Sequence, residues 1–211
     1  MLFWFLPLSQ PLPTGDRKLN VTIARKTVDP MYEQAAILKD ITDGLEQAGI
    51  DYMLSGSVAL NYYAQPRMTR DIDLVVEIQM ADIAPLATQL GDDYYFDDQA
   101  VQMAIENESL FNLIHYPSLT KIDCIVRKSQ AYRQQEFSRR QRVMFGNFPV
   151  WIVSAEDLLL SKLHWLRDSR SEMQFNDILN LINAVPQLVW VYLRYWAEQL
   201  DILALLDEVR P

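Results

Sequence analysis

Sulfur and imidazole ligands are scarce in this chain. Its 211 residues include one cysteine, Cys124, and two histidines, His115 and His164. One cysteine cannot form an internal disulfide, and so few ligands exclude a zinc site built from Cys and His. The sequence therefore suits a reducing cytoplasm, and we expect any catalytic metal to be a hard ion with oxygen ligands.

Basic residues are also few, with 19 Lys and Arg against 28 Asp and Glu and a net charge of −9. Non-specific binding to duplex nucleic acid depends on neutralising phosphates with Lys and Arg, so this charge argues against a broad nucleic-acid surface. A local basic groove remains compatible with it. The hydrophobic share of 50% is that of a folded chain, with one sizeable domain or two small ones that share a core.

Long hydrophobic runs are absent as well. No apolar stretch reaches the length of about 20 residues that crosses a bilayer, so we expect no membrane association. The apolar start, Met1 to Leu8, has no basic residue ahead of it and is broken at Pro7. We expect residues 1–29 to form an N-terminal arm that packs on this chain or on a neighbouring one. A start site placed too far upstream is the equal alternative.

Hydrophobic periodicity predicts an α+β protein whose character changes once along the chain. Helices and strands are mixed up to residue 153 and helices alone follow, so we expect a core at 30–153 and a helical C-terminal subdomain at 154–211. The expected strands are 51–54, 71–78, 94–96, 108–116, 120–127, 142–145 and 148–153. The expected helices are 31–48, 58–64, 81–90, 154–167, 172–184, 188–199 and 201–209.

Two aspartates one residue apart, Asp71 and Asp73, lie in the expected strand at 71–78. A strand has a side-chain period of two, so both carboxylates would project from one face while Ile72, Leu74 and Val76 face the core. Two like charges this close require a cation between them or a proton. The pair therefore predicts a site for a divalent metal ion.

A third acid, Asp123, lies in a later expected strand, on the face opposite Ile122, Cys124 and Val126. On a neighbouring strand it would complete a three-carboxylate cluster for two Mg²⁺ ions about 3.5–4 Å apart. Phosphoryl or nucleotidyl transfer uses such a cluster because its barrier is mainly electrostatic. The alternative is that Asp123 is a solvent-facing residue of an edge strand.

Three small residues, Ser55, Gly56 and Ser57, separate an expected strand from an expected helix, and Ser57 comes fourteen residues before Asp71. A strand, a small-residue turn and a helix in this order point backbone N–H groups at an anion. Gly56 would let the backbone approach a triphosphate, and Ser57 would donate its hydroxyl. The alternative is an ordinary turn and helix cap.

These motifs together resemble the nucleotidyltransferase superfamily whose best-known member is DNA polymerase beta. The run Arg67-x-Thr69-x-Asp71-x-Asp73 is also similar to the small bacterial nucleotidyltransferases of toxin–antitoxin and abortive-infection systems. The resemblance covers residues 53–76 and 120–126 and extends over 154–163. It implies a mixed β-sheet core flanked by helices, an NTP donor, and two Mg²⁺ ions with Mn²⁺ as their substitute. It also implies transfer of NMP to an acceptor hydroxyl with release of pyrophosphate.

The resemblance assigns roles to individual residues. The small residues Gly56 and Ser57 would bind the donor phosphates, with Ser55 beside them. The acids Asp71, Asp73 and Asp123 would bind metal, and Asp123 would also help to deprotonate the acceptor hydroxyl.

Several further residues are expected near the donor. Arg67, Thr69 and Arg70 would contact the triphosphate or the acceptor; for the arginines, the alternative is charge balance in an acidic protein. Lys162 would add a cation against the triphosphate, and Asp177 would pair with it. The alternative for Lys162 is an ordinary exposed helix residue.

A second class of function fits the same residues. The chain would then be a non-catalytic nucleotide-binding protein with the same fold, or one half of a toxin–antitoxin pair. The three acids argue for the enzyme, because an unused carboxylate cluster is an electrostatic cost without benefit.

The acceptor and the partners are less closely specified. A tRNA end, a protein hydroxyl and a small molecule all suit the donor site, and the acidic balance favours a cationic drug or protein over a large RNA. The aromatic residues of the helix expected at 188–199 favour a core or homodimer face over a base-stacking platform.

Overall fold

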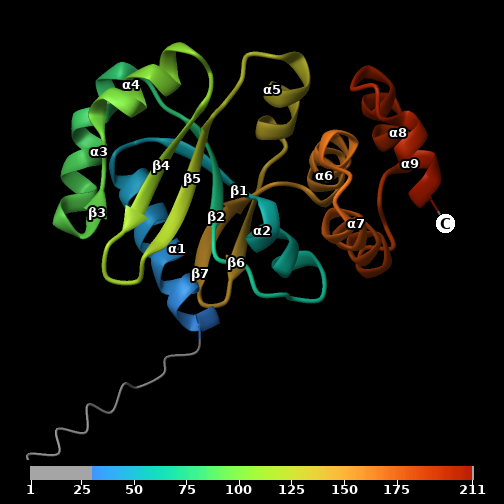
Figure 1. The fold of residues 1–211 in the computed structure, drawn as a ribbon, viewed down its shortest axis with the longest axis horizontal. Helices are drawn as coiled ribbons and strands as arrows, with labels where there is room; N and C mark the ends of the chain where they lie inside the picture. Colours follow the sequence, from blue (N-terminus) through green and yellow to red (C-terminus); the bar gives the residue numbers. More distant parts are fainter. Residues whose placement is uncertain (1–29, 211) are drawn as a thin grey trace, which may run out of the picture.

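The computed structural model describes residues 30–210. The strands in this part of the chain are β1 (Asp51–Ser55), β2 (Ile72–Glu77), β3 (Tyr94–Tyr95), β4 (Leu110–His115), β5 (Thr120–Val126), β6 (Gln141–Phe145) and β7 (Phe148–Ile152). They form one seven-stranded sheet in the order β3-β4-β5-β2-β1-β7-β6 (Figure 1). β2 pairs in parallel with β5, and β1 with β7, while the other neighbouring strands are antiparallel.

Helices flank this sheet. They are α1 (Pro30–Gln47), α2 (Gly56–Tyr63), α3 (Ile83–Leu90), α4 (Asp98–Glu106), α5 (Ala131–Ser138), α6 (Ala155–Ser169), α7 (Glu172–Ala184), α8 (Trp190–Gln199) and α9 (Leu203–Val209). α1 packs against β1, β7 and α3, whereas α2 packs against β2, α6 and α7. The four C-terminal helices gather at one end of the molecule, drawn in orange and red in Figure 1. The predicted α+β class, a mixed sheet flanked by helices, is confirmed.

The alternation of buried and half-buried side chains explains why the central strands can carry a site. Ile72, Leu74 and Val76 of β2 are buried on the core side, and alternate residues of β5 are buried in the same way. The intervening positions, which include Asp73 and Asp123, are only half-buried. The central strands therefore place apolar residues in the core and carboxylates on the opposite face.

Two helices differ from the sequence prediction. α4 has no counterpart among the expected helices; it begins after Asp97, which caps it by accepting hydrogen bonds from the backbone N–H groups of Gln99 and Ala100. α5 has no predicted counterpart because its sequence is mostly polar, and only Tyr132, Glu136 and Phe137 are buried in it. Hydrophobic periodicity gives little signal in so short and polar a segment.

The predicted N-terminal arm and the predicted division into two parts are not tested by the structure. The N-terminal arm expected at 1–29 lies outside the described residues. The division after residue 153 stays a prediction, and the buried apolar side chains on its two sides belong to one continuous cluster. Of the helices within residues 30–210, none has the length and hydropathy that a membrane span requires.

Candidate active site

The register of the central strands brings the predicted site residues together. β1 pairs with β2 so that Ser55 lies opposite Asp73, and β2 pairs with β5 so that Asp73 lies beside Asp123. Asp71 is placed differently from the expectation, because β2 begins only at Ile72 and Asp71 is an exposed residue just before it. The Asp73 and Asp123 carboxylates, from separate strands, are therefore neighbours on the sheet, and Asp71 lies just before the start of β2.

Gly56 is the first residue of α2, and no larger residue fits its place. Its backbone has φ +63°, a conformation that favours glycine, and an added Cβ would lie 1.9 Å from Oδ2 of Asp73. The close approach that the sequence predicted for a ligand is thus made to the Asp73 carboxylate. The start of α2 and the carboxylate of β2 consequently border the same space.

The charge of the Asp73 carboxylate is poorly compensated by protein groups. Burial raises the pKa of Asp73, and the nearby Asp123 and Asp71 raise it further, against opposing effects of the Lys162 ammonium and the Ser57 backbone N–H. A group that repels its neighbours in this way favours either a proton or an added cation.

Asp123 is held on one side by a lysine. The Lys121 ammonium donates to Oδ2 of Asp123 at 3.0 Å and lies 2.8 Å from Oδ1. Oδ1 is buried, and within residues 30–210 it has no hydrogen-bond partner besides this contact with the ammonium. Carboxylate oxygens are the ligands that a hard cation takes, so Asp123 has the chemistry of a metal ligand but already has a counterion.

The arrangement in the structure is not a complete metal centre. No three Asp, Glu, His or Cys side chains among the described residues form a group able to hold a metal ion. The chemistry of Asp73 and Asp123 nevertheless fits Mg²⁺, because both supply carboxylate oxygens, and the repulsion between them that raises the pKa of Asp73 is relieved by an added cation. Metal binding by Asp71, Asp73 and Asp123 stays a prediction.

A chain of ion pairs crosses from α2 to the C-terminal helices. Asp177 of α7 is buried and accepts from Lys162 of α6 at 2.8 Å, as the sequence predicted, so that pairing is confirmed. Arg67 binds both Asp177 oxygens, through Nε and Nη2, at 2.8 Å each. The same Arg67 nitrogen, Nη2, donates to the Ser57 hydroxyl at 2.7 Å. A single network therefore joins the start of α2 to α6 and α7.

This network controls the charge of its members. Burial lowers the pKa of Lys162, although the neighbouring Asp177 carboxylate opposes the shift. Burial alone would raise the pKa of Asp177, but hydrogen bonds from Arg67 and Lys162 hold it below its ordinary value. The lysine that faces the start of α2 is thus a buried cation with one buried counterion.

Three predicted nucleotide contacts have other neighbours in the structure. The Arg67 guanidinium is engaged by Asp177 and by Ser57, so it holds other site residues in place. The Thr69 carbonyl accepts from the Gln34 side chain at 3.1 Å, and Arg70 is exposed. Contacts of Arg67, Thr69 and Arg70 with a triphosphate or an acceptor stay predictions.

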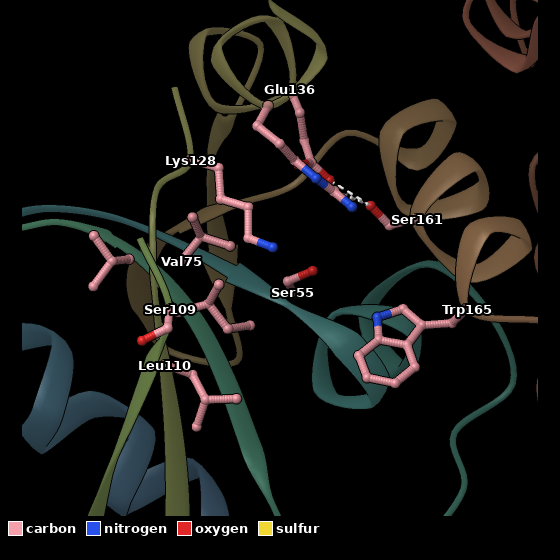
Figure 2. A pocket seen from close by; sticks show the side chains of 11 residues that line it. Ser55, Val75, Ser109, Leu110, Lys128, Glu136, Ser161 and Trp165 are labelled. Atoms are coloured by element: carbon pink, nitrogen blue, oxygen red, sulfur yellow. Dashed lines mark hydrogen bonds and ion pairs between the residues drawn. The ribbon is translucent and has the colours of Figure 1, made fainter. Parts of the chain in front are cut away.

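Two adjoining cavities lie over this face. A cavity of about 250 Å³ is lined by the predicted residues Ser55, Gly56, Ser57, Asp73 and Lys162, together with Gln174, Trp165 and their neighbours. A second cavity, of about 380 Å³, extends between the central strands, α5 and α6 (Figure 2). Ser55, Ile125, Ser161 and Trp165 line both.

Some lining residues were not predicted from the sequence. Ser161 lies next to Lys162 on α6, and Trp165 lies three residues after it. Residues three apart share one face of a helix, so the position of Trp165 relative to Lys162 could have predicted it as a lining residue. Arg133 and Glu136 offered none, because the helix that carries them was not predicted.

The comparison with solved structures identifies the fold. No family model matches the chain, and no curated protein matches it. The solution structure of the antibiotic-resistance factor ANT(2'')-Ia matches with a TM-score of 0.55 and 13% identity, over 85% of this chain and 99% of that chain. The chain thus has the nucleotidyltransferase fold, which confirms the resemblance at the level of fold.

Two other solved structures match less well. The lincosamide antibiotic adenylyltransferase LnuA has a TM-score of 0.46 and 18% identity, over 68% of this chain and 93% of that chain. An antigenic nucleotidyltransferase-like protein from Paracoccidioides brasiliensis has a TM-score of 0.46 and 17% identity, over 75% of this chain and 78% of that chain.

Proposed function

We propose that the protein is an enzyme that transfers NMP from an NTP to an acceptor hydroxyl and releases pyrophosphate. One observation carries the proposal: the cavity of about 250 Å³ combines Asp73, the start of α2 at Gly56 and the buried ammonium of Lys162. A carboxylate beside two features that attract phosphate is the combination that a metal-bound triphosphate needs. The nucleotidyltransferase fold supports the same reaction class.

The proposed roles follow from the positions. Backbone N–H groups at Gly56 and Ser57 and the Lys162 ammonium hold the triphosphate. Asp73 and Asp123, with Asp71 just before β2, would hold Mg²⁺, for which Mn²⁺ would substitute. The ions, when bound, supply positive charge that offsets the charge developing on the phosphates.

The transfer itself is a substitution at the α-phosphorus of the donor. The acceptor oxygen forms a bond to this phosphorus while the bond to the bridging oxygen breaks, and pyrophosphate leaves with that electron pair. The hydroxyl proton passes to the Asp123 carboxylate, which lies beside Asp73 on the sheet.

Asparagine substitutions at the paired acids test the enzyme. Asp73→Asn and, separately, Asp71→Asn should reduce pyrophosphate release by about a hundred-fold or more, because each removes charge that the reaction uses. Circular dichroism should show an unchanged fold. Asp168→Asn is the matched control, since Asp168 is an exposed acid that pairs with Arg167. Unchanged pyrophosphate release in either site variant would reject the assignment.

One observation favours a second candidate, a nucleotide-binding protein without catalysis or a toxin–antitoxin partner. Lys121 already pairs with Asp123, which offsets the charge of the third acid. Calorimetric titration with each NTP, with and without Mg²⁺, separates the candidates when combined with the pyrophosphate assay. Binding without turnover supports the second candidate, and no binding at all leaves a structural interaction protein.

The acceptor is proposed to be a cationic small molecule or protein hydroxyl in the cytoplasm, with a tRNA end as the alternative. The net charge of −9 favours a cation, and the similar structure with a TM-score of 0.55 is an antibiotic-resistance factor. Incubation with radiolabelled NTP and a cell lysate identifies the labelled product. Light scattering of the same sample distinguishes a monomer from a homodimer or a complex with an antitoxin-type partner.

A further inference from the structure

Trp165 occupies an unusual place for a large apolar side chain. It is 68% exposed, yet it lines both cavities on the sheet face. It lies on α6 three residues after Lys162, so the indole and the buried ammonium occupy one side of the helix. Figure 2 shows the indole across the larger cavity from Val75 and Leu110 of the strands. An aromatic face is therefore available beside the proposed phosphate site.

The larger cavity is chemically unlike the smaller one. Apolar side chains of the strands, among them Val75, Leu110 and Ile125, line it together with Lys128, Arg133 and Glu136. Glu136 is buried and accepts from Arg133 at 2.8 Å and from Ser161 at 2.6 Å.

The pairing of Glu136 determines what charge the larger cavity offers. Glu136 is its only lining carboxylate within the described part of the chain, and Arg133 already compensates it. Lys128 points into the cavity and forms no ion pair with residues 30–210 (Figure 2). The uncompensated charge in the cavity is therefore positive, which does not suit a polycation, and its apolar strand residues suit a flat group with apolar faces.

An NTP has two halves that match these two spaces. Its triphosphate is an anion, and its base has two apolar faces that stack on aromatic side chains. The cavities adjoin at Ser55 and Trp165, so one ligand can extend through both. We propose that Trp165 stacks on the nucleobase of the donor, whose nucleoside half occupies the cavity of about 380 Å³. This inference rests on the proposed nucleotide binding at Gly56 and Lys162.

Binding measurements without turnover test the stacking. The tightest of the four common NTPs is titrated by calorimetry as its α,β-methylene analogue, and inorganic tripolyphosphate is titrated as a ligand without a base. Trp165→Ala should weaken analogue binding by about ten-fold or more, the change that aromatic stacking supplies per base. Tripolyphosphate binding should change by less than about two-fold, since it lacks a base. Trp165→Phe should restore most of the analogue affinity.

Tyr195→Ala is the matched control. Tyr195 is an aromatic residue of α8 that is 57% exposed and lines neither cavity, so its removal should leave both affinities unchanged. Equal loss of analogue and tripolyphosphate affinity in Trp165→Ala overturns the stacking role, as does an unchanged analogue affinity. If the unaltered protein binds neither the analogue nor tripolyphosphate, both the proposed function and the stacking are wrong. If Trp165→Ala binds the analogue as tightly as the unaltered protein does, only the stacking is wrong.

Discussion

Neutralising Asp177 should destabilise the protein more than neutralising the lysine with which it pairs. Asp177 and Lys162 side chains are 4% and 5% exposed, and their ion pair has a length of 2.8 Å. Asp177→Asn leaves the Lys162 ammonium buried without a carboxylate partner. Lys162→Met removes the buried cation and leaves Asp177 in its double contact with Arg67.

The magnitude follows from the geometry. Two unit charges at this separation attract by roughly 6 kcal/mol at an effective dielectric constant of about 20, and most of that attraction offsets the cost of desolvating them. Removing one partner of a buried pair costs about 3–5 kcal/mol, because the remaining charge is stranded. We expect Asp177→Asn to lower the free energy of unfolding by about 3 kcal/mol. Lys162→Met should lower it by about 1 kcal/mol, since Arg67 still compensates Asp177.

Urea denaturation followed by circular dichroism provides the measurement, with the slope of the transition checked to be unchanged between variants. The double variant Asp177→Asn with Lys162→Met serves as the control. Its free energy of unfolding should fall by less than the sum of the two single decreases, because neither the Lys162 nor the Asp177 charge is then buried without its partner. The opposite order of the two single variants, or an additive double variant, would refute the assignment of this buried pair.

Three further predictions concern Gly56, Tyr52 and Arg67. Gly56→Ala should cost about 1–3 kcal/mol of stability and abolish pyrophosphate release, because its Cβ would collide with Asp73 in a left-handed backbone; an unchanged melting temperature contradicts this. Burial raises the pKa of Tyr52 to about 12, so its contribution to stability is complete below pH 10 and is lost as the pH rises through 12. That contribution to the free energy of unfolding is about 3 kcal/mol. Stability measured by urea denaturation between pH 9 and 12 should therefore fall less with rising pH in Tyr52→Phe, which has no phenol to ionise. Arg67→Lys should cost about 1–2 kcal/mol in the same assay, because lysine cannot bind both Asp177 oxygens in one plane.

The central strands of the fold could be predicted because residues close together in the sequence determine them. Alternating apolar residues around Asp73 and Asp123 identify the strands and the face from which each acid projects. The start of α6 is similarly local, since Ser154 accepts a hydrogen bond from the backbone N–H of Asp157 as an N-cap. In both places, residues within a few positions of one another determine the conformation.

The remainder depends on long-range contacts. The parallel pairing that places Asp73 beside Asp123 depends on the register between distant strands, which hydrophobic periodicity does not determine. The contact of Arg67 with Asp177 spans 110 residues, so no local pattern could reveal that this arginine is already engaged. α5 was not predicted because its buried residues include the charged Glu136, which is tolerated only through Arg133 and Ser161.

The two cavities share one supporting element, helix α6, and its anchoring determines both. Asp157, in its first turn, is fully buried and accepts hydrogen bonds from Ser154 at 2.6 Å, Arg139 at 2.9 Å and Tyr192 at 2.6 Å. These partners come from the turn before α6, the end of α5 and the helix α8, so they fix the helix from three directions. Functional groups require such rigid support to keep their geometry. Because Lys162 and Trp165 follow on the same helix, the proposed phosphate site and the proposed base site keep a constant spacing, as a single NTP would require.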